Sequence, residues 1–326
     1  MPPQSPSPGS RRRARHGARR LVAPVLVATA VATTLTGAVS GGSAASAGSS
    51  ITVVATVNMW GSIASQLAGA RAHVTSIITN PSVDPHSYEA TAADARALAS
   101  ASYVIENGVG YDAWAQRLLD ANPSSSRTLL NVGQLLGVPS DGNPHQWYSP
   151  ESVARFTDRV TSDLERLDPR DAAYFAARHA SFEAALGQYR ALITQISTRY
   201  AGTPVGASES IFAPLATALH VSLITPGSFL RAISEGSEPT AADKATVDEQ
   251  IRTHAITVFV FNRQNSTPDI ARLVSEAQGQ RIPVTTVTET LSPASTTFQA
   301  WQSRQLERLL AALAKASGAA GAPPSS

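Results

Sequence analysis

Residues 171–200 read DAAYFAARHASFEAALGQYRALITQISTRY, and this stretch decides the fold. Large apolar residues recur at alternating spacings of four and three from Phe175 to Tyr200, and Gly187 is the single weak helix former. Such spacing places one apolar seam along the side of a helix. At 1.5 Å per residue, this helix would be roughly 45 Å long. We therefore predict one continuous helix that connects two parts of the chain as a spine.

The sequence on both sides of this helix alternates between predicted strands and helices. Before it, strands are expected at 51–57, 74–79, 103–106 and 128–132, with helices at 59–69, 91–100 and 112–120 and from Pro150 onward. After it, strands are expected at 205–207, 221–224, 257–261 and 284–287, with helices at 211–219, 240–253, 268–278 and 298–316. This alternation favours parallel sheets with right-handed crossovers. The predicted fold class is α/β, with two lobes, each a mostly parallel sheet flanked by helices, joined by the spine helix.

The first 47 residues differ from the rest of the chain. They hold six arginines and no acid, then an apolar run from Leu21, then small residues that end in Ala45-Ser46-Ala47. This order is typical of an export signal, with cleavage after Ala47 or Ala45; the alternative is an uncleaved anchor. The predicted segments are therefore an export signal at 1–47, an N-terminal lobe at 48–167, the spine at 168–201, a C-terminal lobe at 202–317 and a disordered tail at 318–326.

Charge and cysteine content exclude several classes of protein. The leader holds six of the 26 basic residues, so the remaining chain, which keeps all 24 acids, is acidic. A nucleic-acid-binding surface is not expected in it. The sequence contains no cysteine, which excludes thiolate metal ligands, a cysteine nucleophile and a lipid anchor on a leader cysteine. We expect an exported, extracytoplasmic protein, secreted or tethered by its N-terminal segment, and monomeric.

Four side chains follow predicted strands in positions that suit a metal site. His86 lies in Asp84-Pro85-His86-Ser87-Tyr88-Glu89, and His145 lies in the similar Asn143-Pro144-His145-Gln146-Trp147. Glu209 and Glu289 follow two strands of the second half. Ligands of open parallel sheets bind beyond the carboxyl ends of the strands. Two neutral imidazoles and two carboxylates would balance the charge of a divalent cation between the lobes.

The two Pro-His motifs, Ser208-Glu209 and the spine helix together resemble a known family over nearly all of the chain after the leader. This family comprises the metal-specific solute-binding proteins of bacterial ABC importers for zinc and manganese, the cluster A-I receptors. The resemblance implies a receptor, not an enzyme, that captures one Zn²⁺ or Mn²⁺ as its transported ligand and delivers it to an ABC permease and its ATPase. It implies His86, His145, Glu209 and Glu289 as metal ligands and modest movement of the lobes.

The chain departs from the family pattern at several points. Asn143 and Ser149 stand where the second motif usually has aspartates, so the residue that orients His145 is not given by the motif. Glu289 stands where the family usually has an aspartate, and residues 110–144 contain no histidine-rich loop. Two carboxylates suit manganese, whereas intrinsic affinity favours zinc.

Two other classes of protein could have the same fold or the same types of ligand. A secreted zinc hydrolase could use two histidines and a glutamate, but His-Glu-x-x-His and Gly-x-Ser-x-Gly are absent. A surface adhesin with the same fold is a further alternative. His73, His220 and His254 lie in polar turns beside strands and are not expected to bind metal. Trp60, directly after the first strand, is placed to line the cleft.

Overall fold

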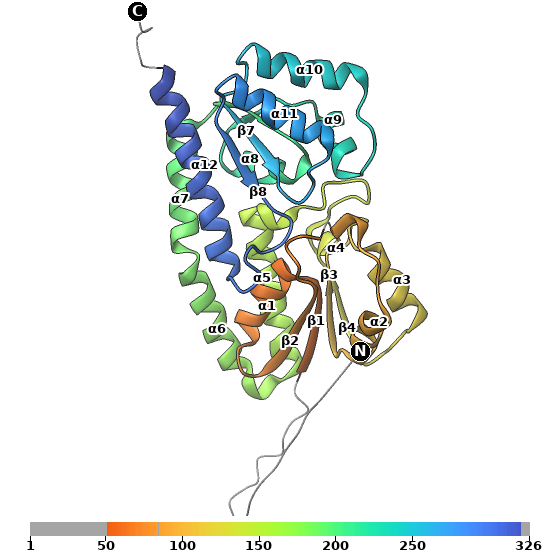
Figure 1. Cartoon of the computed structure of the whole chain (residues 1–326). Coiled ribbons are helices and arrows are strands. Elements are labelled where there is room, and N and C mark those ends of the chain that lie inside the picture. The colour runs from red at the N-terminus through yellow and green to blue at the C-terminus, as the bar shows by residue number, and fades with distance from the viewer. Residues whose placement is uncertain (1–50, 84, 321–326) are drawn as a thin grey trace, which may run out of the picture. The chain divides into compact units, whose positions relative to one another are not determined.

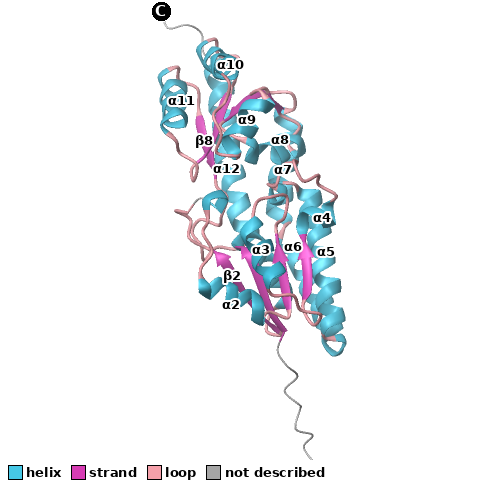
Figure 2. Ribbon diagram, turned by 90° about the vertical axis from the view of Figure 1, so that its right-hand side faces the viewer, coloured by secondary structure: helices cyan, strands magenta, loops and turns pink. Residues whose placement is uncertain are grey.

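The computed structural model describes residues 51–83 and 85–320. The predicted export signal and most of the predicted tail therefore lie outside the described residues. The described chain contains two four-stranded parallel sheets, one in each lobe, each flanked by helices (Figures 1 and 2). The predicted fold class is confirmed. No helix among these residues has the length and apolarity that a membrane crossing would require.

The N-terminal lobe is built on a sheet of strand order β2-β1-β3-β4. Its strands are β1 (Ile51–Val57), β2 (Ala72–Ile78), β3 (Tyr103–Glu106) and β4 (Thr128–Asn131). Its helices are α1 (Asn58–Ala68), α2 (Ala92–Ser100), α3 (Ala113–Ala121), α4 (Val132–Leu136) and α5 (Pro150–Leu167). Thr91 and Asp94 form a capping box on α2, and Ser149 caps α5 ahead of Pro150.

The C-terminal lobe repeats this strand order as β6-β5-β7-β8. Its strands are β5 (Pro204–Ala207), β6 (Ser222–Leu223), β7 (Val258–Asn262) and β8 (Val284–Val287), and its helices are α8 (Ala213–Ala218), α9 (Gly227–Ser234), α10 (Ala241–Arg252) and α11 (Pro268–Gly279). In each lobe the chain order reverses beside the first strand of the sheet. Crevices that bind ligands form at such reversals, outside the carboxyl ends of the strands.

The spine is two helices, and the prediction of one continuous helix was wrong in this respect. Helices α6 (Ala172–Ala185) and α7 (Gly187–Tyr200) meet at Leu186, whose backbone N–H lies 3.1 Å from the Phe182 carbonyl and 3.3 Å from the Glu183 carbonyl. This shared bond tightens the turn, and the glycine that follows is a poor helix former. The predicted apolar seam is nevertheless buried across the break, from Phe175 to Tyr200.

A second long helix, α12 (Phe298–Ala320), lies beside α7 (Figure 1). It extends further than predicted, because residues 318–320 were assigned to the disordered tail and belong to the helix. Tyr189 of α7 and Phe298 of α12 contact each other edge to face, with ring centroids 6.5 Å apart. The backbone N–H of Phe298 also donates to Ser62 Oγ of α1 (3.1 Å), so α12 joins the two lobes.

Glu106, at the end of β3, is a buried acid that lies outside the candidate site. Its Oε1 accepts a hydrogen bond from Asn131 Nδ2 (2.7 Å), whereas Oε2 has no hydrogen-bond partner among the described residues. Burial raises the pKa of Glu106 to about 7, above its ordinary value of 4.5. The folded protein therefore binds a proton here that the unfolded chain releases at lower pH.

We expect this acid to make the free energy of unfolding fall as the pH rises from about 4.5 to 7. Glu106→Gln, which keeps the shape and cannot ionise, should remove that part of the pH dependence. Urea denaturation of both proteins at pH 5 and pH 8 measures the difference, with exposed Glu307→Gln as the control. Equal pH dependence in Glu106→Gln and the wild type would contradict the assignment.

Candidate metal centre

The candidate ligands lie in loops at the carboxyl ends of strands from both sheets. His86 lies in a short 3₁₀ turn, Pro85–Ser87, after β2, and His145 lies after β4 and α4. Glu209 follows β5 by two residues, and Glu289 follows β8 by two residues. Each lobe thus contributes two of the four predicted residues, as the strand-end positions indicated.

Three of the four residues gather into one cluster. His86, His145 and Glu289 each offer a ligand atom within 4.8 Å of the other two. His145 Nε2 lies 3.4 Å from Glu289 Oε2, and His86 Nε2 lies 3.8 Å from Glu289 Oε1. The side chains of His145 and Glu289 are 0% and 1% exposed, whereas His86 is 22% exposed and forms the outer wall of the cluster.

The orientation of His145 is set by Asn143. Asn143 Oδ1 lies 3.0 Å from the backbone N–H of His145, which can only donate, so this end of the amide is the oxygen. The same oxygen lies 2.8 Å from His145 Nδ1, which must therefore carry the proton. His145 Nε2, on the side of Glu289, is the nitrogen left to bind a metal. An amide thus fixes the tautomer that metal binding requires, as an aspartate would.

Glu209 lies beside this cluster but does not complete it. Asn262 Nδ2 donates to Glu209 Oε1 (2.6 Å) and also to Glu289 Oε1 (2.8 Å). Asn265 Nδ2 donates to Glu209 Oε2 (2.7 Å). Burial first, and the charge of Glu289 second, raise the pKa of Glu209 to about 8. In the metal-free protein Glu209 therefore keeps its proton at neutral pH, beside the carboxylate of Glu289.

Two side chains of the centre, Tyr111 and Asn262, were not singled out from the sequence. Tyr111 Oη donates to Glu289 Oε2 (3.0 Å), and its ring lies edge-on to His86, with centroids 4.8 Å apart. The turn before it has positive φ at Gly108, Val109 and Gly110. A β-branched residue at φ 56° is strained, and strain of this kind is often found at functional sites. The Gly108-Val109-Gly110 motif was the one sequence signal for this turn.

Tryptophans lie behind the imidazoles instead of in the cleft. The Trp147 ring is edge-on to His145, with centroids 5.2 Å apart. Trp60 is fully buried, and its Nε1 donates to Asn107 Oδ1 (2.8 Å). The expectation that Trp60 lines the cleft was therefore wrong, because α1 turns this side chain into the core, where it packs on Phe156.

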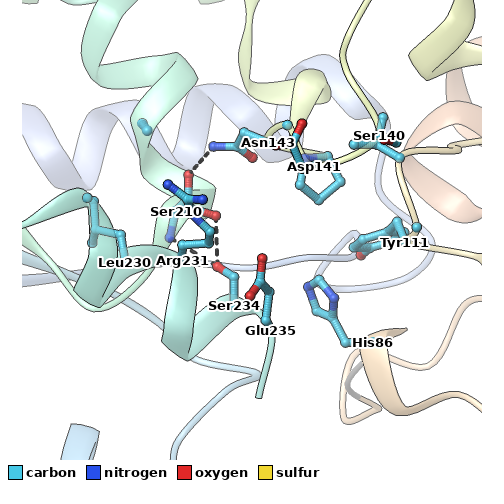
Figure 3. Close-up of a pocket in the computed structure, with 16 residues that line it drawn as sticks. His86, Tyr111, Ser140, Asp141, Asn143, Ser210, Leu230, Arg231, Ser234 and Glu235 are labelled. Atoms are coloured by element: carbon cyan, nitrogen blue, oxygen red, sulfur yellow. Dashed lines mark hydrogen bonds between the residues drawn. The ribbon is translucent and has the colours of Figure 1, made fainter. Parts of the chain in front are cut away.

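A cavity of about 710 Å³ opens beside the cluster, between loops of the two lobes (Figure 3). His86, Tyr111 and Asn143 line it from the N-terminal lobe, and Ser210, Arg231 and Ser234 line it from the C-terminal lobe. This volume exceeds that of a fully hydrated metal ion, since six waters occupy about 180 Å³ at ≈ 30 Å³ each. The cavity therefore has room for a hydrated cation beside the exposed edge of His86.

The donor set fits a divalent transition metal. Imidazole nitrogen and carboxylate oxygen are ligands that zinc and manganese share. Burial of carboxylates without a counter-charge is costly, and a dication would neutralise the pair Glu209 and Glu289. A two-lobed α/β protein with such a cluster between its sheets has the fold and the ligand types expected of a metal-binding solute receptor.

The comparisons with known proteins agree with this class. Residues 53–312 match the family described as zinc-uptake complex component A, periplasmic, and the chain belongs to this family. It is similar to the periplasmic zinc-binding protein TroA of Treponema pallidum, with a TM-score of 0.68 and 20% identity over 81% of this chain and 99% of that one. A manganese-bound periplasmic metal-binding protein of Candidatus Liberibacter asiaticus gives a TM-score of 0.65 and 21% identity over the same shares.

The chain matches less than half the length of the first two curated relatives. The manganese-binding lipoprotein MntA of Halalkalibacterium halodurans is 28% identical over 41% of this chain, and the match spans 46% of that protein. The match to the iron-binding protein YfeA of Yersinia pestis spans 40% of that protein. The manganese ABC transporter substrate-binding lipoprotein PsaA of Streptococcus mitis is 23% identical over 75% of this chain and 82% of its own length.

Replacing Asn262 tests how the buried carboxylates are held without metal. Asn262→Ala removes one donor from both carboxylates, and we expect it to lower the free energy of unfolding of the metal-free protein by about 1–3 kcal/mol. Asn265→Ala removes a donor from Glu209 alone and should cost less. Urea denaturation in the presence of a chelator measures both. Equal losses in the two variants would contradict the central place of Asn262.

Proposed function

We propose that this protein is an extracytoplasmic receptor of an ABC importer that captures a divalent transition metal between its lobes. The observation that carries the proposal is the cluster of His86, His145 and Glu289, to which the two lobes contribute opposite walls. The protein needs no chemistry on the ion beyond binding, because the ion is its cargo. Zn²⁺ and Mn²⁺ are the candidates, since relatives named for each metal have this fold.

The proposed ligands are His86, His145, Glu289 and Glu209. The first three lie within ligand distance of a common centre. Glu209 is included because it shares the Asn262 amide with Glu289 and is buried beside it. A cation that neutralised Glu289 would lower the pKa of Glu209 from about 8 and favour the anion that binds metal.

The proposed mechanism uses the tautomer and the walls of the site. Asn143 keeps a proton of His145 on Nδ1, so Nε2 is the nitrogen that would bind the ion. Tyr111 donates to Glu289 and holds this carboxylate toward the two imidazoles. Buried rings behind the site exclude water, which strengthens the attraction between the carboxylates and the ion.

Partner and location follow from the same proposal. The receptor would deliver the ion to an ABC permease with its ATPase, and it would act as a monomer outside the cytoplasm. The arginine-rich leader and relatives named as periplasmic or as substrate-binding lipoproteins support export. This chain has no cysteine to carry a lipid, so we propose secretion or a retained N-terminal segment as its mode of export.

A receptor is favoured over an enzyme by the number of protein ligands. Catalytic zinc sites keep an open position for water, whereas four protein ligands would close the coordination sphere. MntA, YfeA and TroA are named as metal-binding proteins, and PsaA is named as the substrate-binding lipoprotein of a manganese ABC transporter. We therefore propose no catalytic role for the cluster.

The proposal predicts that Zn²⁺ or Mn²⁺ stabilises the protein. An ion that binds only the native state should raise the melting temperature of the metal-free protein by several degrees. His86→Ala should remove most of this rise, because it deletes one ligand. Metal analysis of the purified protein and thermal melts with and without each ion measure the effect.

His73→Ala is the matched control, since His73 is an exposed histidine of β2 that bonds only weakly to Thr75 (3.3 Å). It should leave the rise intact. A wild-type protein that neither ion stabilises would refute the proposed function.

Glu209→Gln tests whether Glu209 is a fourth metal ligand or an acid that is held only by Asn262 and Asn265. In the metal-free protein we expect the variant to melt higher than the wild type above pH 8, because the ionised acid is buried beside Glu289. The metal-dependent rise should shrink, because an amide oxygen is a weaker ligand than a carboxylate. Glu235→Gln, at the exposed edge of the cavity, is the control. A full metal-dependent rise in Glu209→Gln would exclude this residue from the ligand set.

A further inference from the structure

Asn143 makes a second contact that its role toward His145 does not require. Its Nδ2 donates to the backbone carbonyl of Ser210 at 2.7 Å, which Figure 3 shows as a dashed line across the cavity wall. Asn143 belongs to the N-terminal lobe, and Ser210 begins the turn before α8 of the C-terminal lobe. One amide therefore bonds to both lobes beside the candidate site.

The orientation of this amide is fixed at both ends. The Ser210 carbonyl can only accept, so it faces the amide nitrogen, and the backbone N–H of His145 can only donate, so it faces the amide oxygen. An aspartate could satisfy His145 in the same way. It could not donate to Ser210, and its second oxygen would face the carbonyl oxygen at hydrogen-bond distance. Only a carboxamide of this length serves both partners.

Ser210, which accepts the bond from Asn143, is itself held in place by α9 of the C-terminal lobe. Ser234 Oγ of α9 lies 3.1 Å from the backbone N of Ser210 and 2.8 Å from Ser210 Oγ. Ser210 directly follows Glu209, so the bridge connects the loop of one proposed ligand to the loop of another.

We infer that Asn143 is an interlobe bridge that holds the cleft closed at the cavity wall and slows release of the bound ion. The inference rests on the proposed function for its second half only. The Ser210 hydroxyl also lies 3.3 Å from His145 Nδ1, beside this bridge. The bonds from Tyr148 Oη to the Thr288 carbonyl (2.9 Å) and from Leu291 N to Asn58 Oδ1 (3.1 Å) lie deeper between the lobes. The Asn143 bond differs from these because it lines the cavity through which the ion would leave.

Asn143→Asp is the direct test, because it keeps an acceptor for His145 and removes the donor to Ser210. Loss of one good hydrogen bond should increase the rate of metal dissociation about tenfold. Stopped-flow measurement with a competing chelator, on protein loaded with Zn²⁺ or Mn²⁺, gives this rate. Asn143→Ala should release the ion as fast and also bind it more weakly, because His145 loses its acceptor.

The separation of the lobes gives a readout that does not depend on metal. The chain has no cysteine, so Arg117→Cys on α3 and Ala245→Cys on α10 place a single pair of spin labels at exposed positions of the two lobes. In the metal-free protein, Asn143→Asp should widen the distribution of distances between the labels. Asn122→Asp is the matched control, since Asn122 also donates an amide hydrogen to a backbone carbonyl, that of Leu118, within one lobe.

Each outcome decides the inference. Wider distances and faster release in Asn143→Asp, with Asn122→Asp like the wild type, would support it. Unchanged distances would overturn it, and so would wider distances with unchanged release. If the wild type bound neither metal, the proposed function would fail, and the label distances alone would decide whether Asn143 bridges the lobes.

Discussion

Two buried carboxylates that approach each other are the constraint on which the site depends. Glu209 and Glu289 come from the ends of β5 and β8 and share one amide donor, Asn262. In a region of low dielectric, a pair of like charges is strongly unfavourable unless a proton or a cation is present. The raised pKa of Glu209 is the local sign of this cost. In the proposed site, a bound ion would relieve this cost. The imidazoles, the tyrosine and the closed lobes would hold that ion in place.

The repeated strand order explains how one chain brings these groups together. Both sheets have the order in which the first strand lies between the second and the third, so both crevices open at equivalent places. When the crevices face each other, the loops after β2 and β4 meet the loops after β5 and β8. The spine, the α12 helix and their buried aromatic contacts hold this facing arrangement. The site therefore depends on the topology that the two lobes share. The N-terminal lobe supplies the histidines and the C-terminal lobe supplies the glutamates.

The sequence predicted the parts of this structure that depend on local pattern. Strands of both sheets end ahead of His86, His145, Glu209 and Glu289, as expected. It did not predict the break at Leu186, because the apolar seam continues through it and only backbone geometry reveals it. The sequence also did not predict short helices such as α4 and α9, because they are too brief to show a helical period.

The residues that the sequence missed are those whose partners are distant in the chain. Tyr111 bonds to Glu289 across 178 positions, and Asn262 bonds to Glu209 across 53. No spacing rule connects such pairs, and only the meeting of the two sheets makes them neighbours. Asn143 is a further example. The motif indicated only that an asparagine replaces the usual aspartate. In the structure Asn143 still orients His145, and it also donates a bond to Ser210 that an aspartate could not make.

Carboxamides recur around the site for a reason of charge. Asn143, Asn262 and Asn265 contact His145, Glu209 or Glu289, and Gln264 bonds to the Val83 carbonyl and to Thr290 beside them. An amide can accept from an imidazole and donate to a carboxylate without adding any charge of its own. The electrostatics of the centre are thus left to the two glutamates. A monovalent ion would leave one negative charge buried, whereas a divalent ion balances both. In the proposed site, the neutrality of the surrounding amides would therefore favour a divalent ion over a monovalent one.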